Sequence, residues 1–147
     1  MKTSKYQKRF YRDWVYPNDF FQERIVVRET DLQILTDKPL DKVFVINKIK
    51  AYRRQIEKYI TKDERFLNSL KPITVEINSP LIVREMAKAA KKANVGPMAA
   101  VAGAIAQFLG ASLLKKGYRD VIIENGGDIY LKITRPMRVG IYSGRSR

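Results

Sequence analysis

The chain has 147 residues, enough for one domain with a hydrophobic core, and carries a formal charge of +14. It contains neither cysteine nor histidine, which excludes disulfides, thiolate metal sites, histidine general bases and most zinc centres. The first residues lack the apolar stretch of a signal peptide, so we expect a cytoplasmic protein. The positive charge favours polyanions, but no nucleic-acid recognition motif accompanies it. We therefore expect a solvated basic surface and no nucleic-acid partner.

The first half of the chain predicts strands followed by a long helix. Residues 5–21 alternate in a way that predicts a strand with its rings on the core, base stacking being the alternative. Two short strands, 25–28 and 32–35, should follow, and then a helix over 41–62. An apolar stripe at helical spacing supports this helix: Val45, Ile49, Tyr52, Ile56 and Tyr59. Basic side chains off that stripe predict a solvated face, with anion binding as the alternative: Lys48, Arg53, Arg54, Lys58 and Lys62.

The middle of the chain predicts a strand and a second helix. Residues 73–77 should form the strand, because Pro72 interrupts the chain before them. Ser79 and Pro80 then predict a helix start, with Ser79 as the N-cap and Pro80 in the first turn. The side expected to be buried comprises Ile82, Met86, Ala89, Ala90 and Ala93, and the basic side comprises Arg84, Lys88, Lys91 and Lys92. Residues 94–96 should end this helix.

A helix of small residues begins at Pro97. The stretch 95–114 has no charge and is long enough to span a membrane, but it is mostly Ala and Gly, with Gln107 in its middle. We therefore expect a helix buried against a sheet and no membrane span. Small residues recur four positions apart, at Gly96, Ala100 and Ala104 and at Ala99 and Gly103. They predict a close approach by a sheet or a flat ligand, so that Gly103→Leu should disrupt folding by overpacking.

Three further strands, at 120–124, 129–133 and 138–142, complete an expected α+β fold, an antiparallel or mixed sheet packed against helices. The first two flank the turn Asn125-Gly126-Gly127-Asp128, whose glycines permit positive φ. This turn is either a plain hairpin or a ligand contact. In the second case Asp128 would bind a ribose hydroxyl, a ring N–H or a hard cation such as Mg²⁺.

The helix start at Gly96-Pro97 is the second candidate contact. It leaves the N–H groups of Met98 and Ala99 free to bind an anion such as a phosphate, an ordinary helix start being the alternative. We expect this helix start and the glycine turn to line one pocket. The candidate ligand-binding residues are Gly96, Pro97, Met98, Ala99, Glu124, Asn125, Gly126, Gly127 and Asp128. Asp128 is also the candidate metal ligand, and no catalytic residue is identified.

These segments resemble a known family. The runs 95–106, 124–131 and 139–144 are similar to the UPF0280 family, as are Tyr11-Arg12, the segments 29–32 and 66–70, Pro72-Ile73 and Met86. That family is similar in turn to the ApbE-type FMN transferases, whose corresponding turn also ends in Gly-Gly-Asp. The resemblance implies an ApbE-like fold, FAD or FMN with Mg²⁺ as cofactors, and a flavin- or nucleotide-like small molecule as ligand. A homo-oligomer is compatible with it.

The chain also departs from the family pattern. UPF0280 sequences usually continue into a glycine loop with serine and histidine and an Ala-Asp-x-x-Ala-Thr segment, whereas this sequence ends at Arg147 and has no lysine between Met98 and Gly110. We therefore expect one ApbE-like domain, 1–147, truncated at its C-terminus, holding the N-terminal portion of the family fold and lacking autonomous catalysis. The alternatives are FMN transfer from FAD to a protein Ser or Thr, a helper role in sulfur assimilation and homocysteine formation, and a basic nucleic-acid-binding module.

Overall fold

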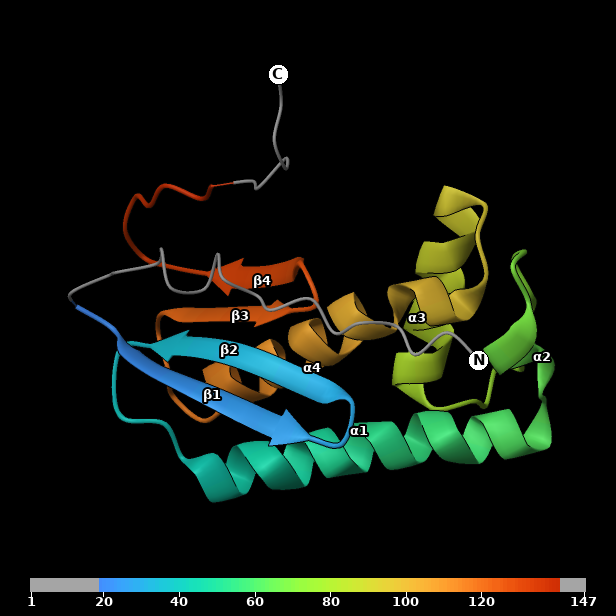
Figure 1. The fold of residues 1–147 in the computed structure, drawn as a ribbon, viewed down its shortest axis with the longest axis horizontal. Coiled ribbons are helices and arrows are strands. Elements are labelled where there is room, and N and C mark those ends of the chain that lie inside the picture. Colours follow the sequence, from blue (N-terminus) through green and yellow to red (C-terminus); the bar gives the residue numbers. More distant parts are fainter. Residues whose placement is uncertain (1–18, 141–147) are drawn as a thin grey trace, which may run out of the picture.

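The computed structural model describes residues 19–140 and shows a four-stranded antiparallel sheet with helices beside it (Figure 1). The strands, in sheet order, are β1 (Phe21–Val27), β2 (Thr30–Thr36), β3 (Val121–Asn125) and β4 (Asp128–Lys132). The helices are α1 (Lys42–Lys62), α2 (Arg65–Asn68), α3 (Leu81–Ala93) and α4 (Val101–Lys115), and a 3₁₀ turn, η2 (Pro97–Ala100), precedes α4. The expected α+β class is confirmed.

Two hairpins meet in the middle of the sheet. β1 and β2 form one hairpin, β3 and β4 form the other, and β2 pairs with β3 from Leu32 opposite Asn125 to Thr36 opposite Val121. The β2–β3 pairing joins segments that are separated in the sequence by all the helices. This long-range pairing therefore sets where the glycine turn at 126–127 lies relative to α4.

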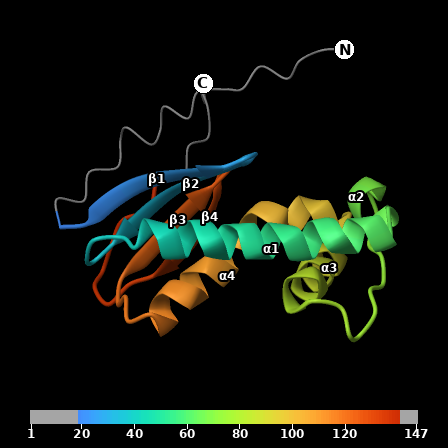
Figure 2. The same ribbon diagram turned by 90° about the horizontal axis from the view of Figure 1, so that it is seen from below.

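The helices α1 and α4 cover one face of the sheet (Figure 2). Alternate strand residues point toward them, because successive side chains of a strand leave on opposite faces. The resulting core cluster contains Ile25, Leu32, Ile34, Val45, Ile49, Ala106, Leu109, Leu113, Tyr118, Val121 and Ile123. A second cluster lies beyond the sheet, where α1, α2, α3 and the start of α4 meet: Ile56, Tyr59, Phe66, Ile82, Val83, Met86, Ala104 and Ile105. The long helix α1 contributes residues to both core clusters and so connects them.

Helix α3 differs from its expected start. Pro80 is the N-cap, the helix begins at Leu81, and the Ser79 hydroxyl is buried without a hydrogen-bond partner, so the prediction of Ser79 as a capping side chain was wrong. Ala89 and Ala93 are exposed, whereas Val83 and Ala87 are buried in their place. The buried face is therefore turned toward the side of Val83, since α3 packs against α1 and α4 together. The helix ends as expected, at Asn94 with φ +56°.

The boundaries of other elements also differ from those expected from the sequence. Residues 73–77 are irregular and form no strand, because no neighbouring strand pairs with them. Residues 138–140, the start of the expected strand 138–142, are irregular as well, and residues 141–142 lie outside the described residues. Most of the expected strand 5–21 also lies outside them, since the described residues begin at position 19. The strands at 25–28 and 32–35 are longer than expected, and α1 is confirmed. Its N-cap is Asp41, whose carboxylate accepts from the Phe44 N–H at 3.0 Å.

Helix α4 is part of the protein core. Within residues 19–140, the one helical stretch long and apolar enough to span a bilayer is Pro97–Lys115, with 19 residues. Its buried residues are Ala104, Ile105, Ala106, Leu109, Gly110 and Leu113. They pack against β3, β4 and α3, as expected for a helix buried against a sheet.

Candidate ligand cleft between helix α4 and strand β4

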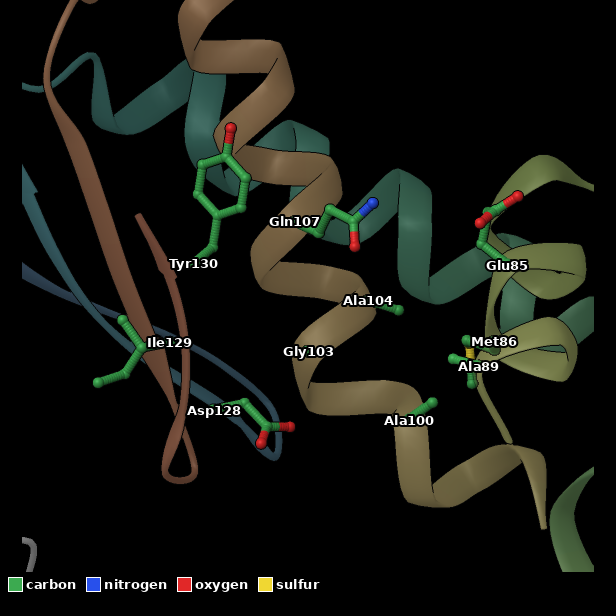
Figure 3. Close-up of a pocket in the computed structure, with 10 residues that line it drawn as sticks. All are labelled: Glu85, Met86, Ala89, Ala100, Gly103, Ala104, Gln107, Asp128, Ile129 and Tyr130. Carbon is green, nitrogen blue, oxygen red and sulfur yellow. The ribbon is translucent and has the colours of Figure 1, made fainter. Parts of the chain in front are cut away.

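A cleft of about 380 Å³ lies between α3, α4 and strand β4 (Figure 3). Its lining residues are Glu85, Met86, Ala89, Ala100, Gly103, Ala104, Gln107, Asp128, Ile129 and Tyr130. The volume falls within the range of small-molecule sites, about 300–1,000 Å³. Most of the wall is apolar, and a few polar groups project into it, which is the usual composition of a ligand site.

Small residues of η2 and α4 form the floor of this cleft. Ala100 is the last residue of η2 and the N-cap of α4, and Gly103, Ala104 and Gln107 follow at spacings of three and four positions, which places the four residues on one side of this helical stretch. The absence of long side chains at the first three positions leaves room above the helix backbone. The sequence left two expectations for the small residues spaced four positions apart, a close approach by a sheet or by a flat ligand; three of these five residues, Ala100, Gly103 and Ala104, line the cleft.

Strand β4 supplies the facing wall. Asp128 and Tyr130 are two positions apart, so their side chains leave the strand on the same face and point toward α4 (Figure 3). A Cβ atom placed on Gly103 would lie 3.4 Å from the Asp128 Oδ2 atom. The carboxylate of Asp128 therefore lies directly beside the small-residue floor.

The glycine turn before β4 is fixed in place by its neighbours. Gly126 and Gly127 have φ of +62° and +99°, the backbone of a two-residue type I′ hairpin. The Asn125 amide donates to the Ala102 carbonyl at 3.0 Å and ties the turn to α4. The Glu124 carboxylate accepts from the Gly127 N–H at 2.8 Å. Glu124 and Asn125 therefore position Asp128 and do not themselves line the cleft.

The polar groups of the cleft are two carboxylates, an amide and a phenol. Glu85 lies across the cleft from Asp128 (Figure 3), and the Lys88 ammonium is 3.9 Å from its carboxylate. Burial raises the pKa of the Tyr130 phenol, so this group remains a hydrogen-bond donor at neutral pH. The lining residues include no cation. The cleft is therefore suited to a ligand part that offers N–H or O–H donors.

The predicted helix-start contact lies elsewhere in the structure. Gly96 and Pro97 are buried, and neither lines the cleft. A Cβ atom on Gly96 would lie 1.7 Å from the Ser69 carbonyl oxygen, so this glycine permits a backbone-to-backbone contact. The Ala99 N–H donates to the Gly96 carbonyl at 3.1 Å, and Met98 packs against the second core cluster. The structure therefore brings Asp128, but not Gly96 or Pro97, to the cleft.

The close helix–sheet contact belongs to Gly110 and not to Gly103. A Cβ atom on Gly110 would lie 2.1 Å from Cε1 of Tyr130, whereas the position of Gly103 has room for one. The expectation that Gly103→Leu overpacks a helix–sheet contact was therefore wrong in its reason. A leucine at position 103 would extend into the cleft beside Asp128.

Sequence reasoning missed the polar lining residues Glu85, Gln107 and Tyr130. Two of them carried a usable signal. Gln107 is four positions after Gly103 and so shares its side of the helix. Tyr130 is two positions after Asp128 and shares its strand face. Glu85 had no such signal, because the packing of α3 against α4 decides which side of α3 meets the cleft.

The residues present do not form a metal site by themselves. No group of three or more acidic side chains able to hold an ion occurs in the described part of the chain. Mg²⁺ is usually bound through one or two carboxylates together with substrate phosphates. Asp128 is a single carboxylate on the turn side of the cleft. Within residues 19–140 it belongs to no group of three or more side chains that could hold a metal ion together.

The fold defines an α+β protein with a cleft between a core helix and an edge strand. A family model described as AbpE bacteria matches residues 12–147, and the chain belongs to that family. A UPF0280 protein of Methanococcus maripaludis is 41% identical over 127 residues, which are 86% of this chain and 51% of the relative. A UPF0280 protein of Methanospirillum hungatei is 46% identical over 120 residues, 82% of this chain and 49% of the relative.

A UPF0280 protein of Methanocaldococcus jannaschii is 40% identical over 133 residues, 87% of this chain and 51% of the relative. The UPF0280 resemblance is thereby confirmed, and the names of these relatives assign them no activity. The chain spans about half the length of the curated relatives it matches.

Proposed function

We propose that the cleft between α4 and β4 binds the flat ring system of a flavin- or nucleotide-like ligand. The observation that carries this proposal is the pairing of a small-residue floor, formed by Ala100, Gly103 and Ala104, with the side chains of Asp128 and Tyr130. A planar ring requires close approach on one side and hydrogen-bond partners at its edge, and the cleft offers both. Membership of the AbpE bacteria family supports the same ligand class, through the likeness to ApbE-type flavin transferases.

Each lining group has a defined role in this proposal. The ring lies against the α4 backbone where side chains are shortest. The Asp128 carboxylate accepts from a ring N–H or a ribose hydroxyl, the Gln107 amide both donates and accepts, and the Tyr130 phenol donates. These residues bind and orient the ligand, and none of them is assigned a proton-transfer step.

Flavin binding is measured by quenching of FMN and FAD fluorescence on titration with the protein. We expect Gly103→Leu to abolish quenching, because the leucine side chain occupies the ring position. Asp128→Asn should weaken binding about tenfold, the value of one charge-assisted hydrogen bond. Gly140→Ala is the matched control, since a Cβ atom at Gly140 meets nothing within 4 Å. Unchanged binding in both cleft variants, each with native circular dichroism, would contradict the proposal.

Catalysis is a separate question from binding. Transfer of FMN from FAD to a Ser or Thr hydroxyl needs a metal held against the pyrophosphate and an activated acceptor. The described residues provide neither a metal cluster nor a histidine base. We therefore expect this chain with Mg²⁺ and FAD to leave the mass of an acceptor peptide unchanged, while a full-length relative is assayed in parallel. An FMN adduct formed by residues 1–147 alone would establish the transferase alternative.

A further inference from the structure

A second cavity, of about 500 Å³, lies between the β1–β2 turn and the side of α1 that faces it. It is lined by Val26, Val27, Arg28, Ile46, Lys50, Arg53, Arg54 and Glu57, which we call the basic groove. It shares no lining residue with the cleft beside α4. Four of its eight lining residues are cations and one is an anion, whereas the cleft has two carboxylates and no cation. The linings of the two sites are therefore opposite in charge.

Helical spacing gathers the cations of α1 on the groove side. Ile46, Lys50, Arg53 and Glu57 are three or four positions apart and follow one side of the helix, with Arg54 next to Arg53. The apolar stripe of α1, which includes Val45 and Ile49, packs into the core, and the half-buried Ile46 packs against that core and lines the groove. The lining residues come from α1 and from the β1–β2 hairpin, whose turn lies beside α1 (Figure 1).

Arg53 is already held in position. Its guanidinium donates to the Thr30 hydroxyl at 2.9 Å and to the Glu57 carboxylate at 3.2 Å, and it also pairs with Glu29. Its side chain is only 18% exposed. A guanidinium fixed in this way loses little conformational entropy when an anion binds beside it.

Lys50 and Arg54 are different, because both are exposed and neither has an ion-pair partner among the described residues. Within the described residues, two cations without an ion-pair partner therefore line the groove together with the fixed guanidinium of Arg53. The four groove cations there are balanced only in part by the carboxylates of Glu29 and Glu57, so a bound anion would offset part of the remaining positive charge.

The backbone conformation of Arg28 is a second observation, separate from the charges of α1, that points to the groove. It is the first residue of the two-residue β1–β2 turn and has φ +53°, a backbone conformation in which glycine is preferred at this turn position. Its side chain reaches Glu57 at a distance of 3.7 Å and lines the groove. An arginine held in a strained conformation places its charge on the groove at a cost in stability that glycine would avoid.

We propose that the basic groove binds the phosphate or pyrophosphate group of a small organic anion through Arg28, Lys50 and Arg54, with Arg53 fixed between them. The apolar side chains of Val27 and Ile46 contact the organic part. The volume suits a phosphorylated metabolite and is in the range of small-molecule sites.

The test uses inorganic pyrophosphate, titrated calorimetrically into the full chain at low salt and at about 0.15 M ionic strength. We expect saturable binding to one site. Each of Arg28→Gly, Lys50→Gln and Arg54→Gln should weaken it about fivefold, the effect of one exposed ion contact. Lys58→Gln is the matched control, since it removes an α1 charge outside the groove and should leave the affinity unchanged within about twofold.

Arg28→Gly separates binding from folding. Glycine adopts φ +53° without strain, so the variant should unfold at the same temperature as the natural sequence or higher while its pyrophosphate affinity falls. Equal losses in Lys58→Gln and the groove variants, or no saturable binding, would overturn the proposal. It would also be overturned if a single-stranded oligonucleotide bound more tightly with the same residue dependence and a steep salt dependence, because the groove would then be a nucleic-acid contact.

Discussion

Gly96→Ala is expected to lower the free energy of unfolding by about 3 kcal/mol or more. The added Cβ atom would lie 1.7 Å from the Ser69 carbonyl oxygen, 2.7 Å from its carbon and 3.2 Å from the Leu70 Cα. All three are backbone atoms, so no side-chain rotation relieves the clash, and the segment after α2 must move away from η2. The φ of Gly96 is −73°, which alanine adopts freely, so the penalty is purely steric.

Chemical denaturation measured by circular dichroism tests this prediction. In a domain of this size a loss of 3 kcal/mol corresponds to a fall of roughly 6–12 °C in the melting temperature. Gly140→Ala is the control, since a Cβ atom there meets nothing within 4 Å and its stability should change by less than about 0.5 kcal/mol. A Gly96→Ala variant as stable as this control would show that the contact with Ser69 is not present in solution.

Gly110→Ala is expected to lower the free energy of unfolding by about 1–3 kcal/mol. The new Cβ atom would lie 2.1 Å from Cε1, 2.2 Å from Cδ1 and 2.8 Å from Cζ of Tyr130. The ring packs against the first core cluster between β4 and α4, so it must be displaced before the alanine fits. The same displacement would alter the cleft, because Tyr130 is also one of its walls.

Gly103→Ala is the matched control for this effect, on the same helix and seven residues earlier. Its Cβ atom would lie 3.4 Å from the Asp128 Oδ2 atom, an ordinary contact, so the gain in helix propensity should raise stability by roughly 0.5–1 kcal/mol. The two substitutions therefore change stability with opposite signs. Tyr130→Ala provides the second test, because in its background the penalty of Gly110→Ala should largely disappear. A penalty that persists without the ring would refute the proposed clash.

Local sequence patterns predicted some residues of the cleft and missed others. The four-residue recurrence of small residues between Gly96 and Ala104 predicted a close approach by a sheet or a flat ligand, and Ala100, Gly103 and Ala104 line the cleft. The glycine pair predicted a turn that ends in Asp128, and this turn is present. The expectation that this turn and Gly96-Pro97 line one pocket rested only on their common suitability for close backbone approach. The lining of the cleft includes Asp128 but neither Gly96 nor Pro97. Only packing shows that Gly96 meets the Ser69 backbone while Asp128 meets the cleft.

The sequence alone determined the class and order of most elements, because hydrophobic periodicity, turn glycines and the Asn94 helix end are local signals. It also determined the family. The tertiary structure alone decided which glycine is a close contact, that residues 73–77 find no strand partner, and that Glu85 and Tyr130 meet across one cleft. These outcomes depend on the β2–β3 pairing and on the packing of α3 against α4, which join residues far apart in the chain. Contacts between distant segments produce no periodic pattern in a single sequence, so they are seen only in the folded structure.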